Sequence, residues 1–249
     1  MFYSLGRILK LTLYGIDLAV YTLSIYLITF LPDHWLSRFY PRLFWIWCRL
    51  FVRALGVDLR LHQNYTRAMP KHYILIANHP SAFEDIGIPA LFPVYSLAKI
   101  EVRDWWFAGR ISAAAGTLYV HREDRKSRRG AYQQIIEELR RGKNIALYPE
   151  GGCKGRLIFK AFHFGAFDIS LKTGIPIVPV FLHYEAQHDF EWKPEVSLVR
   201  KIWEILTAKN KRANYYVFDA LDPTQFSNRE EYAEHARGLY LKWQAKYLE

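Results

Sequence analysis

The sequence predicts an α/β fold, with a mixed, largely parallel sheet flanked by helices and an N-terminal membrane-associated helical hairpin in front of it. From residue 56 onward, short apolar runs typical of buried strands alternate with stretches of helical periodicity. Before residue 56 the chain has a long apolar run and then a segment rich in tryptophan and arginine. We therefore expect two domains, membrane-anchoring helices at 1–55 and an α/β domain at 56–249.

The apolar run at 11–31 contains a single formal charge, Asp17. At ~1.5 Å per residue, a helix of this length measures about 31 Å, close to the hydrocarbon thickness of a bilayer. Arg7 and Lys10 precede the run, which predicts a cytoplasmic N-terminus if the helix spans the membrane. No small-residue cleavage site follows it, so we expect no removed signal peptide.

The segment at 40–55 places Trp45 and Trp47 among three arginines, which is the composition of a helix lying in the membrane interface. A break at 31–33, which includes Pro32, separates this segment from the apolar run, so the two together predict a helical hairpin. The alternative is an amphipathic helix packed on the soluble core.

Short apolar runs predict seven strands in the α/β domain. They lie at 57–61, 73–77, 95–98, 117–120, 145–148, 177–182 and 215–218. Helical patterns lie between them at 105–114, 130–141 and 163–172. Near the end, Ser227 and Glu230 fit a capping box that begins a helix running towards Tyr247.

Composition excludes a disordered chain and a disulfide scaffold. Apolar residues make up 51% of the chain, too many for a disordered tail. The 249 residues carry a net charge of +10 and 16% of them are aromatic, which favours either nucleic acid or an anionic membrane surface as partner. Two cysteines, Cys48 and Cys153, are too few for a disulfide framework and indicate a reducing compartment.

The loop after the strand at 73–77 carries His79, with Glu84 and Asp85 five and six residues later. A histidine and a carboxylate are the parts of a general base and its orienting partner. Five residues of continuous helix turn about 500°, so the pairing requires His79 on the loop and the acid in the first helical turn. The alternative is that Ser81 and Glu84 form a capping box and His79 is only a turn residue.

Three further features follow in order along the chain. The strand at 117–120 is preceded by Gly116 and followed by His121 and Arg122. The strand at 145–148 leads into Pro-Glu-Gly-Gly-Cys-Lys-Gly, a glycine-rich loop whose backbone N–H groups are suited to an anion. A Pro-Ile-Val-Pro sequence begins the strand at 177–182.

Together and in this order, the four blocks resemble the glycerophospholipid acyltransferase family, which acylates 1-acylglycerol-3-phosphate and other lysophospholipids. The family's blocks are Asn-His-four residues-Asp, a Gly-x-Ile/Tyr-x-x-x-Arg strand end, Phe-Pro-Glu-Gly-Thr-Arg and Pro-Ile-Val-Pro. The matches span residues 78–180. Lys99, in an Ala-Lys-x-Glu stretch, also fits the family.

Two departures from the family pattern stand out. The spacing of the first block selects Glu84, while the family's usual aspartate comes one residue later as Asp85. Glu84 resembles the lipid A acyltransferase branch of the wider superfamily, so we choose it, with Asp85 as the alternative. In the third block, Gly152 and Cys153 replace the Thr-Arg pair, which puts a phosphomonoester acceptor in doubt because the Lys154 that follows offers a point charge instead of a fork.

The resemblance implies that His79, held by Glu84, takes the proton of a lysolipid hydroxyl as its oxygen attacks an acyl thioester. It also implies a set of substrate-binding residues: Lys99, Gly116, Arg122, Glu150, Gly151 and Lys154. We expect no metal and no cofactor, with acyl-CoA or acyl carrier protein as co-substrate. Cys153 lacks a motif-linked histidine, so we expect no covalent acyl-cysteine intermediate.

The predicted function is therefore transfer of an acyl chain to a lysophospholipid, first of all 1-acylglycerol-3-phosphate, at the cytoplasmic face of a membrane. The alternatives are another acceptor, such as a lyso-amino-acid lipid, and a membrane-bound scaffold that has lost the chemistry. The partners are then membrane phospholipids, the lysophospholipid and the acyl donor. The basic run at 121–129 favours a nucleic-acid-binding protein, but no binding signature accompanies it, so we expect no nucleic-acid partner.

Overall fold

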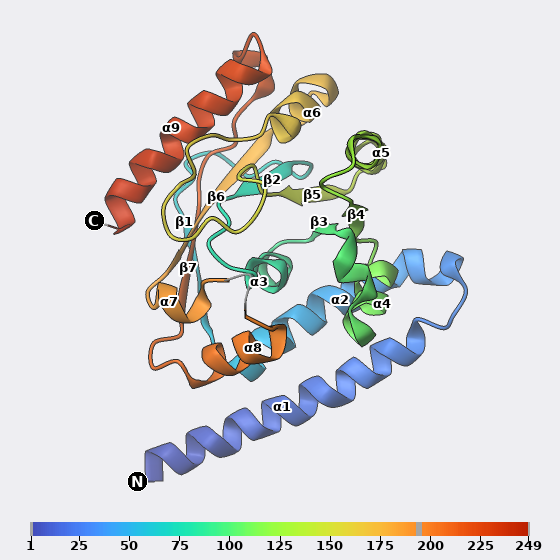
Figure 1. Ribbon diagram of the computed structural model, residues 1–249, viewed down its shortest axis with the longest axis vertical. Coiled ribbons are helices and arrows are strands. Elements are labelled where there is room, and N and C mark those ends of the chain that lie inside the picture. The colour runs from blue at the N-terminus through green and yellow to red at the C-terminus, as the bar shows by residue number, and fades with distance from the viewer. Residues whose placement is uncertain (1, 193–195, 249) are drawn as a thin grey trace. The chain divides into compact units, whose positions relative to one another are not determined.

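The structure is a computed structural model that describes residues 2–192 and 196–248 (Figure 1). The chain forms two compact units, residues 1–57 with 85–131 and residues 58–84 with 132–249. The N-terminal helices thus share a unit with residues 85–131, and the domain boundary at residue 55 stays a prediction.

The first unit is mostly helical. Its elements are α1 (Phe2–Ile28), α2 (Asp33–Leu55), most of α3 (Glu84–Leu91), β3 (Val94–Lys99), the 3₁₀ helix η1 (Ile100–Asp104), α4 (Trp106–Ala114), β4 (Leu118–Val120) and the start of α5 (Arg125–Arg140). Strands β3 and β4 pair in parallel. The strands predicted at 95–98 and 117–120 and the helix predicted at 105–114 are confirmed.

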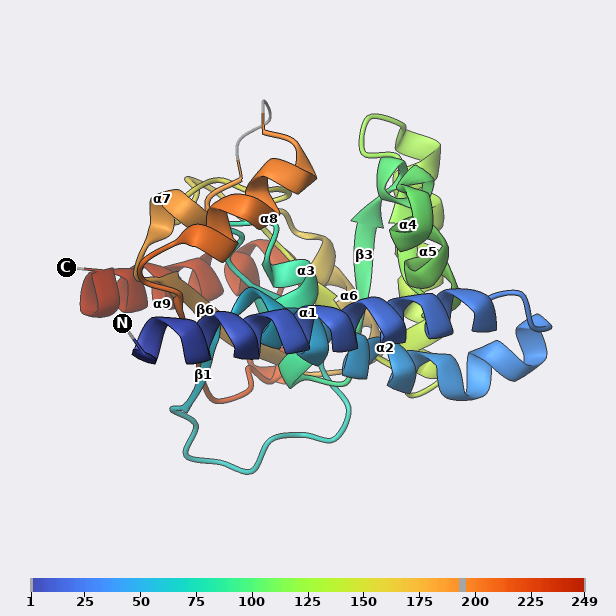
Figure 2. The same ribbon diagram turned by 90° about the horizontal axis from the view of Figure 1, so that it is seen from below.

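Helices α1 and α2 lie side by side and are joined by a short turn (Figure 2). The indole N–H of Trp47 donates to Oγ1 of Thr22 at 2.8 Å, and the Tyr40 hydroxyl donates to the Ile25 carbonyl at 2.9 Å. Pro32 stands directly before α2, where it interrupts the helical hydrogen bonds. The predicted pair of helices, with its break at Pro32, is confirmed.

One face of α2 is buried inside the protein. Its buried residues recur at helical spacing: Leu36, Tyr40, Phe44, Trp47, Cys48, Val52 and Leu55. The indole N–H of Trp45 donates to the Val94 carbonyl at 3.2 Å, which ties α2 to the residues just before β3. The apolar face of 40–55 is therefore a packing surface, as in the alternative to an interfacial helix.

Helix α1 behaves differently, because its apolar side chains are exposed. Residues Ile8–Ile28 are long and apolar enough to cross a membrane, and few of them are buried. The exposed stripe contains Leu9, Leu13, Ile16, Val20, Leu23, Leu27 and Phe30. An apolar pocket of about 410 Å³ between α1, α2 and α4 is lined in part by Leu18, Trp47 and Phe107. An exposed apolar stripe of this length is the signature of contact with lipid.

The second unit contains strands in the order β1-β7-β6-β2-β5. They are β1 (Asp58–Gln63), β2 (Ile74–Ala77), β5 (Asn144–Leu147), β6 (Ile177–Tyr184) and β7 (Arg212–Val217). Neighbours pair in parallel except β6 and β7, which are antiparallel. Strands β2 and β5 are buried along their whole length, which explains why both read as continuous apolar runs. The predicted mixed, largely parallel sheet is confirmed.

Helices α6 (Gly165–Thr173) and α9 (Arg229–Leu248) pack against each other beside this sheet (Figure 1). Two short helices, α7 (Gln187–Phe190) and α8 (Leu198–Thr207), lie between β6 and β7 and were not predicted; the 3₁₀ helix η2 (Pro223–Gln225) precedes α9. The predicted cap of α9 is wrong by one residue. Oδ1 of Asn228 accepts the Glu231 N–H at 2.8 Å, and the Glu231 carboxylate accepts the Ser227 N–H at 3.0 Å.

Aspartate on the outward stripe of α1 should release the protein from membranes. A charge at the centre of a membrane helix costs about 2.5–3.5 kcal/mol by insertion scales. We expect Val20→Asp/Leu23→Asp to move the protein from the membrane pellet to the supernatant after a carbonate wash, with an unchanged melting temperature in detergent. Leu157→Asp, at a comparably exposed position of the second unit, should stay in the pellet. Release of the unmodified protein by salt alone would contradict membrane insertion of α1.

Candidate active site

The predicted histidine lies where two parallel strands end. Strands β2 and β5 are neighbours and run in the same direction, so the loops after Ala77 and Leu147 leave the same edge of the sheet. Ligand sites of parallel sheets form at this edge. His79 is on the first loop and is 6% exposed, and Tyr148 begins the second.

The Glu84 carboxylate contacts His79 directly. Its Oε2 lies 3.2 Å from Nδ1 of His79, and Glu84 is fully buried at the first residue of α3. The predicted geometry is therefore present, with the histidine on the loop and the acid in the first helical turn. Asp85, the alternative acid, is exposed.

The other oxygen of Glu84 satisfies the capping-box alternative at the same time. Its Oε1 accepts the Ser81 N–H at 2.9 Å and the Tyr184 hydroxyl at 2.9 Å. Oγ of Ser81 accepts the Phe83 N–H at 3.0 Å, as expected of a helix N-cap. The two hypotheses for Glu84 are thus compatible, because each uses a different oxygen of one carboxylate.

Glu150 holds the backbone of the histidine loop. Its Oε2 accepts the His79 N–H at 2.6 Å, and its Oε1 accepts the Phe159 N–H at 2.8 Å. The side chain is 1% exposed, so both oxygens are committed to the protein. In the structure both oxygens of Glu150 accept backbone N–H groups and so position the loop, and a contact of Glu150 with substrate stays a prediction. Sequence reasoning missed these N–H contacts because a motif glutamate does not reveal where its oxygens point.

Asn78 fastens the start of the same loop to strand β6. Its side-chain oxygen accepts the Leu182 N–H at 2.7 Å, and its side-chain amide donates to the Leu182 carbonyl at 3.0 Å. Together with the contact between Glu150 and the His79 N–H, this fixes the start of the histidine loop.

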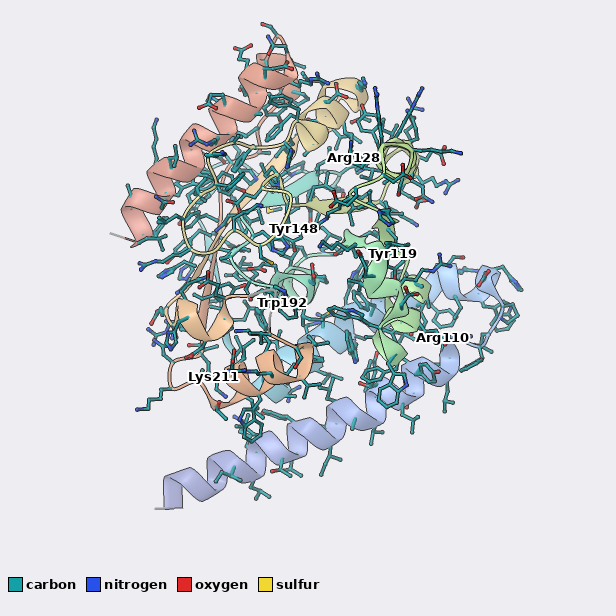
Figure 3. All side chains as sticks on the ribbon, viewed as in Figure 1. Arg110, Tyr119, Arg128, Tyr148, Trp192 and Lys211 are labelled. Carbon is teal, nitrogen blue, oxygen red and sulfur yellow. The ribbon has the colours of Figure 1, made fainter. Side chains whose placement is uncertain are left out.

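Two side chains from the second loop flank the His79 ring. Tyr148 stacks on the imidazole, with ring centroids 4.2 Å apart, and it is labelled in Figure 3. The Sγ of Cys153 lies 3.8 Å from Nδ1 and 3.7 Å from Nε2 of His79, and its S–H donates to the Ser81 carbonyl at 3.3 Å. The sequence motif does not link Cys153 to a histidine, but the structure places it beside the His79 ring. Because Sγ is almost equidistant from both nitrogens, it is not in line with the lone pair of either one.

The glycine-rich loop carries the remaining predicted residues of the second unit. Gly151 has φ of +76°, and a Cβ there would lie 2.6 Å from the His163 ring, so glycine is required. The backbone N–H of Lys154 donates to the His79 carbonyl at 3.1 Å, and its exposed ammonium lies over the Phe159 ring at 4.6 Å. The structure thus brings His79, Glu84, Glu150, Gly151 and Lys154 together.

Lys99, Gly116 and Arg122 belong to the first unit. Lys99 is exposed at the end of β3, and the Arg122 carbonyl accepts a guanidinium N–H of Arg128 at 2.7 Å. Gly116 has φ of +84°, and a Cβ there would meet the Tyr95 ring at 3.1 Å. These contacts make Gly116 a turn residue, and binding of substrate by the three stays a prediction.

Burial dominates the electrostatics of the site. It raises the pKa of Glu84 well above the usual range, while hydrogen bonds from the Tyr184 hydroxyl and the Ser81 N–H act in the opposite direction. Burial also raises the pKa of Glu150, against the N–H groups of Phe159 and His79. Among the residues that the structure describes, no group of three or more His, Cys, Asp and Glu side chains could hold a metal ion.

The sequence profile of the Acyltransferase family matches residues 58–183, just over half of the chain. The chain belongs to the acyltransferase family. The matched range includes Asn78, His79, Glu84, the glycine-rich loop and Leu182. The resemblance inferred from the four blocks is therefore confirmed.

Relatives extend this match over most of the chain. It is 27% identical over 238 residues to a lyso-ornithine lipid O-acyltransferase from Pseudomonas aeruginosa, covering 93% of this chain and 88% of that protein. It is 26% identical to a 1-acyl-sn-glycerol-3-phosphate acyltransferase from Neisseria gonorrhoeae, covering 64% of this chain and 63% of that protein. These names confirm the predicted class of enzyme, a glycerophospholipid O-acyltransferase.

A solved structure shares the fold. The crystal structure of a 1-acyl-sn-glycerophosphate acyltransferase from Thermotoga maritima matches with a TM-score of 0.64 and 21% identity, covering 96% of this chain and 95% of that one. The likeness extends over both units of the chain, and each unit therefore belongs to the shared fold.

The raised pKa of Glu84 predicts how stability depends on pH. Because burial raises the pKa of Glu84, ionising this group costs more in the folded protein than in the unfolded chain, whose carboxyl loses its proton near the ordinary pKa of 4.5. The stability of the unmodified protein relative to Glu84→Gln should therefore be greatest below pH 4.5 and fall as pH rises, by up to about 1.4 kcal/mol per pH unit. Melting temperatures in detergent from pH 5 to pH 9 test this.

The control is Glu204→Gln, since hydrogen bonding by Lys201 lowers the pKa of Glu204 and places its titration below the range tested. That variant should show a flat difference from pH 5 to pH 9. A difference for Glu84→Gln that grows with pH would mean that Glu84 is stabilised as a carboxylate.

Proposed function

We propose that this chain transfers an acyl chain from an acyl thioester to the free hydroxyl of a lysolipid, with His79 as general base. The observation that carries this is the contact between Nδ1 of His79 and the buried Glu84 carboxylate. A carboxylate at Nδ1 fixes the ring and leaves Nε2 as the nitrogen that accepts a proton.

The reaction needs no covalent enzyme intermediate. Nε2 of His79 takes the hydroxyl proton as the oxygen attacks the thioester carbonyl carbon. The carbon–sulfur bond then breaks, the imidazolium returns the proton to the departing thiol, and an ester and a free thiol leave. Acyl-CoA or acyl carrier protein supplies the thioester, at the cytoplasmic face of the membrane in which α1 is anchored.

We assign Glu84 and Glu150 to positioning rather than to contact with substrate. Glu84 orients the ring, and Glu150 holds the backbone N–H of the same residue. Lys154 is a candidate for the acceptor headgroup, since its ammonium is exposed while its backbone is hydrogen-bonded to the histidine loop. Lys99 and Arg122 are further candidates for anionic groups of the substrates.

We propose two candidates for the acceptor, 1-acylglycerol-3-phosphate first and a lyso-amino-acid lipid as the alternative. Two observations support the lyso-amino-acid lipid. The third block has Cys153 where the family has arginine and offers Lys154 only one residue later, which weakens bidentate binding of a phosphomonoester. The relative that matches over 93% of this chain is a lyso-ornithine lipid O-acyltransferase.

A panel of acceptors separates these possibilities. Membranes carrying the protein are incubated with labelled acyl-CoA or acyl carrier protein and with 1-acylglycerol-3-phosphate, lyso-ornithine lipid or lysophosphatidylcholine. We expect one of the first two acceptors to gain the label and His79→Ala to abolish it. No transfer to any lysolipid by the unmodified protein would contradict the proposed function and favour a scaffold.

The two neighbouring carboxylates give the sharpest test of the assignment. Glu84→Gln keeps the size and the capping capacity but removes the charge, so turnover should fall on the order of 10²-fold or more. Asp85→Asn is the matched control, since the next helical residue points about 100° away, and it should cost much less. The reverse order of effects in steady-state assays would transfer the orienting role to Asp85.

Cys153 distinguishes direct transfer from an acyl-enzyme. Its contact with the His79 ring suggests a nucleophile, yet Sγ is out of line with both nitrogens and its S–H is bonded to the Ser81 carbonyl. We therefore expect Cys153→Ala to keep at least about a tenth of the turnover. Loss of activity to the level of His79→Ala, together with an acylated Cys153 by mass spectrometry, would establish the covalent route.

A further inference from the structure

Helix α8 carries two strongly exposed apolar side chains on the side that faces away from the protein. Its inner side is made by Lys201 and Ile205, which are buried. Val199 is 78% exposed and Trp203 is 64% exposed, one helical turn apart on the opposite side. The apolar face of α8 thus extends beyond the buried Ile205 to side chains that are turned away from the core.

The side chains that hold α8 in place are polar. The buried ammonium of Lys201 pairs with the Glu204 carboxylate at 2.7 Å and donates to the Asp189 carbonyl at 3.2 Å. Lys211 donates to the Leu206 carbonyl in the last turn of α8 at 2.5 Å, and it is labelled beside the helix in Figure 3. Hydrogen bonds thus fix the helix on the unit and keep Val199 and Trp203 turned outward.

Helix α8 is also connected to the histidine loop by α7. Helices α7 and α8 pack together, and Phe190 of α7 stacks on Tyr184 with ring centroids 4.5 Å apart. The Phe190 carbonyl accepts the Ser81 hydroxyl at 2.5 Å, and the Gln187 amide donates to the Pro80 carbonyl at 3.2 Å. Helix α8 is therefore connected to the histidine loop through α7, which packs on α8 and is hydrogen-bonded to Pro80 and Ser81.

We propose that α8 is a second membrane-docking element, distinct from the α1 anchor, which seats the histidine loop at an anionic lipid surface. An outward tryptophan with aliphatic neighbours is the composition of an interfacial helix. Two basic side chains of the segment 197–211, Arg200 and Lys209, are exposed and can interact with anionic headgroups. Docking of α8 would bring His79 to the depth at which a lysolipid presents its hydroxyl, so the inference rests in this part on the proposed function.

Depth-dependent quenching tests the docking without any need for activity. In the full chain with Cys48→Ala and Cys153→Ala, a single cysteine is introduced as Trp203→Cys or, on the polar flank, as Arg200→Cys, and labelled with a nitrobenzoxadiazole fluorophore. The protein is reconstituted into phosphatidylglycerol/phosphatidylethanolamine vesicles with or without acyl-chain nitroxide lipids. We expect about half or more of the emission at position 203 to be quenched and about a tenth or less at position 200.

Two results would overturn the proposal. Emission from position 203 that is as water-like and as unquenched as that from position 200 would mean that α8 faces solvent. Blue-shifted emission at 203 that lipid nitroxides do not quench would mean that protein, either α1 or a second copy of the chain, covers the helix.

A kinetic measurement then separates this inference from the proposed function. Val199→Ser/Trp203→Ser should raise the apparent KM for a long-chain lysolipid in vesicles about tenfold or more, from the loss of two interfacial apolar contacts. It should leave kcat/KM for a short-chain, water-soluble lysolipid unchanged. Equal effects on both acceptors would contradict a docking role, whereas inactivity of the unmodified protein on either would contradict the proposed function only.

Discussion

The buried carboxylate of Glu84 is the group on which the histidine loop depends. It accepts hydrogen bonds from a backbone N–H and from a tyrosine hydroxyl on one oxygen, and it contacts the imidazole with the other. Burying a carboxyl group costs free energy unless its oxygens are satisfied, and here each oxygen has at least one partner. The same group therefore begins α3, orients His79 and links the loop to Tyr184 of β6.

The two buried acids of the site, Glu84 and Glu150, bind different groups of the same histidine. Glu84 binds the side chain of His79, while Glu150 binds its backbone N–H. The Asn78 amide pairs with both backbone groups of Leu182 in β6. Glu84 from α3, Glu150 from the loop after β5 and Leu182 of β6 thus hold the His79 side chain, its backbone N–H and the neighbouring Asn78, which leaves little freedom to the ring.

Much of the fold was predictable from the sequence, because its strands and its hairpin depend on local pattern. Strands β2 and β5 are continuous apolar runs buried on both faces, and the break at Pro32 separates two helices. Helices α7 and α8 were missed. Helix α7 is only four residues long and gives no periodic signal. The apolar residues of α8 do recur at helical spacing, so its signal was present in the sequence and was overlooked. The cap of α9 moved by one residue because Asn228 and Ser227 are both good N-caps and only the backbone path decides between them.

The candidate site was predictable to the level of residue pairs but not of atoms. The spacing from His79 to Glu84 predicted their contact, since only a loop followed by a helical turn brings them together. The sequence could not predict that Glu150 faces the backbone or that Cys153 lies against the ring, because both depend on how the glycine-rich loop folds back. The hydrogen bond from Tyr184 to Glu84 was missed because the two residues lie 100 positions apart in the chain and only the fold brings them together.

The protonation of the His79 ring tests the central role of Glu84 most directly. Histidine-selective ¹⁵N labelling of the full chain in detergent reports which ring nitrogen carries the proton, with the His79 signals assigned from their loss in His79→Ala. The account predicts a proton on Nδ1 and none on Nε2 at a pH where the ring is neutral, and a mixture of tautomers in Glu84→Gln. A proton on Nε2 in the unmodified protein, or a spectrum that Glu84→Gln leaves unchanged, would contradict it.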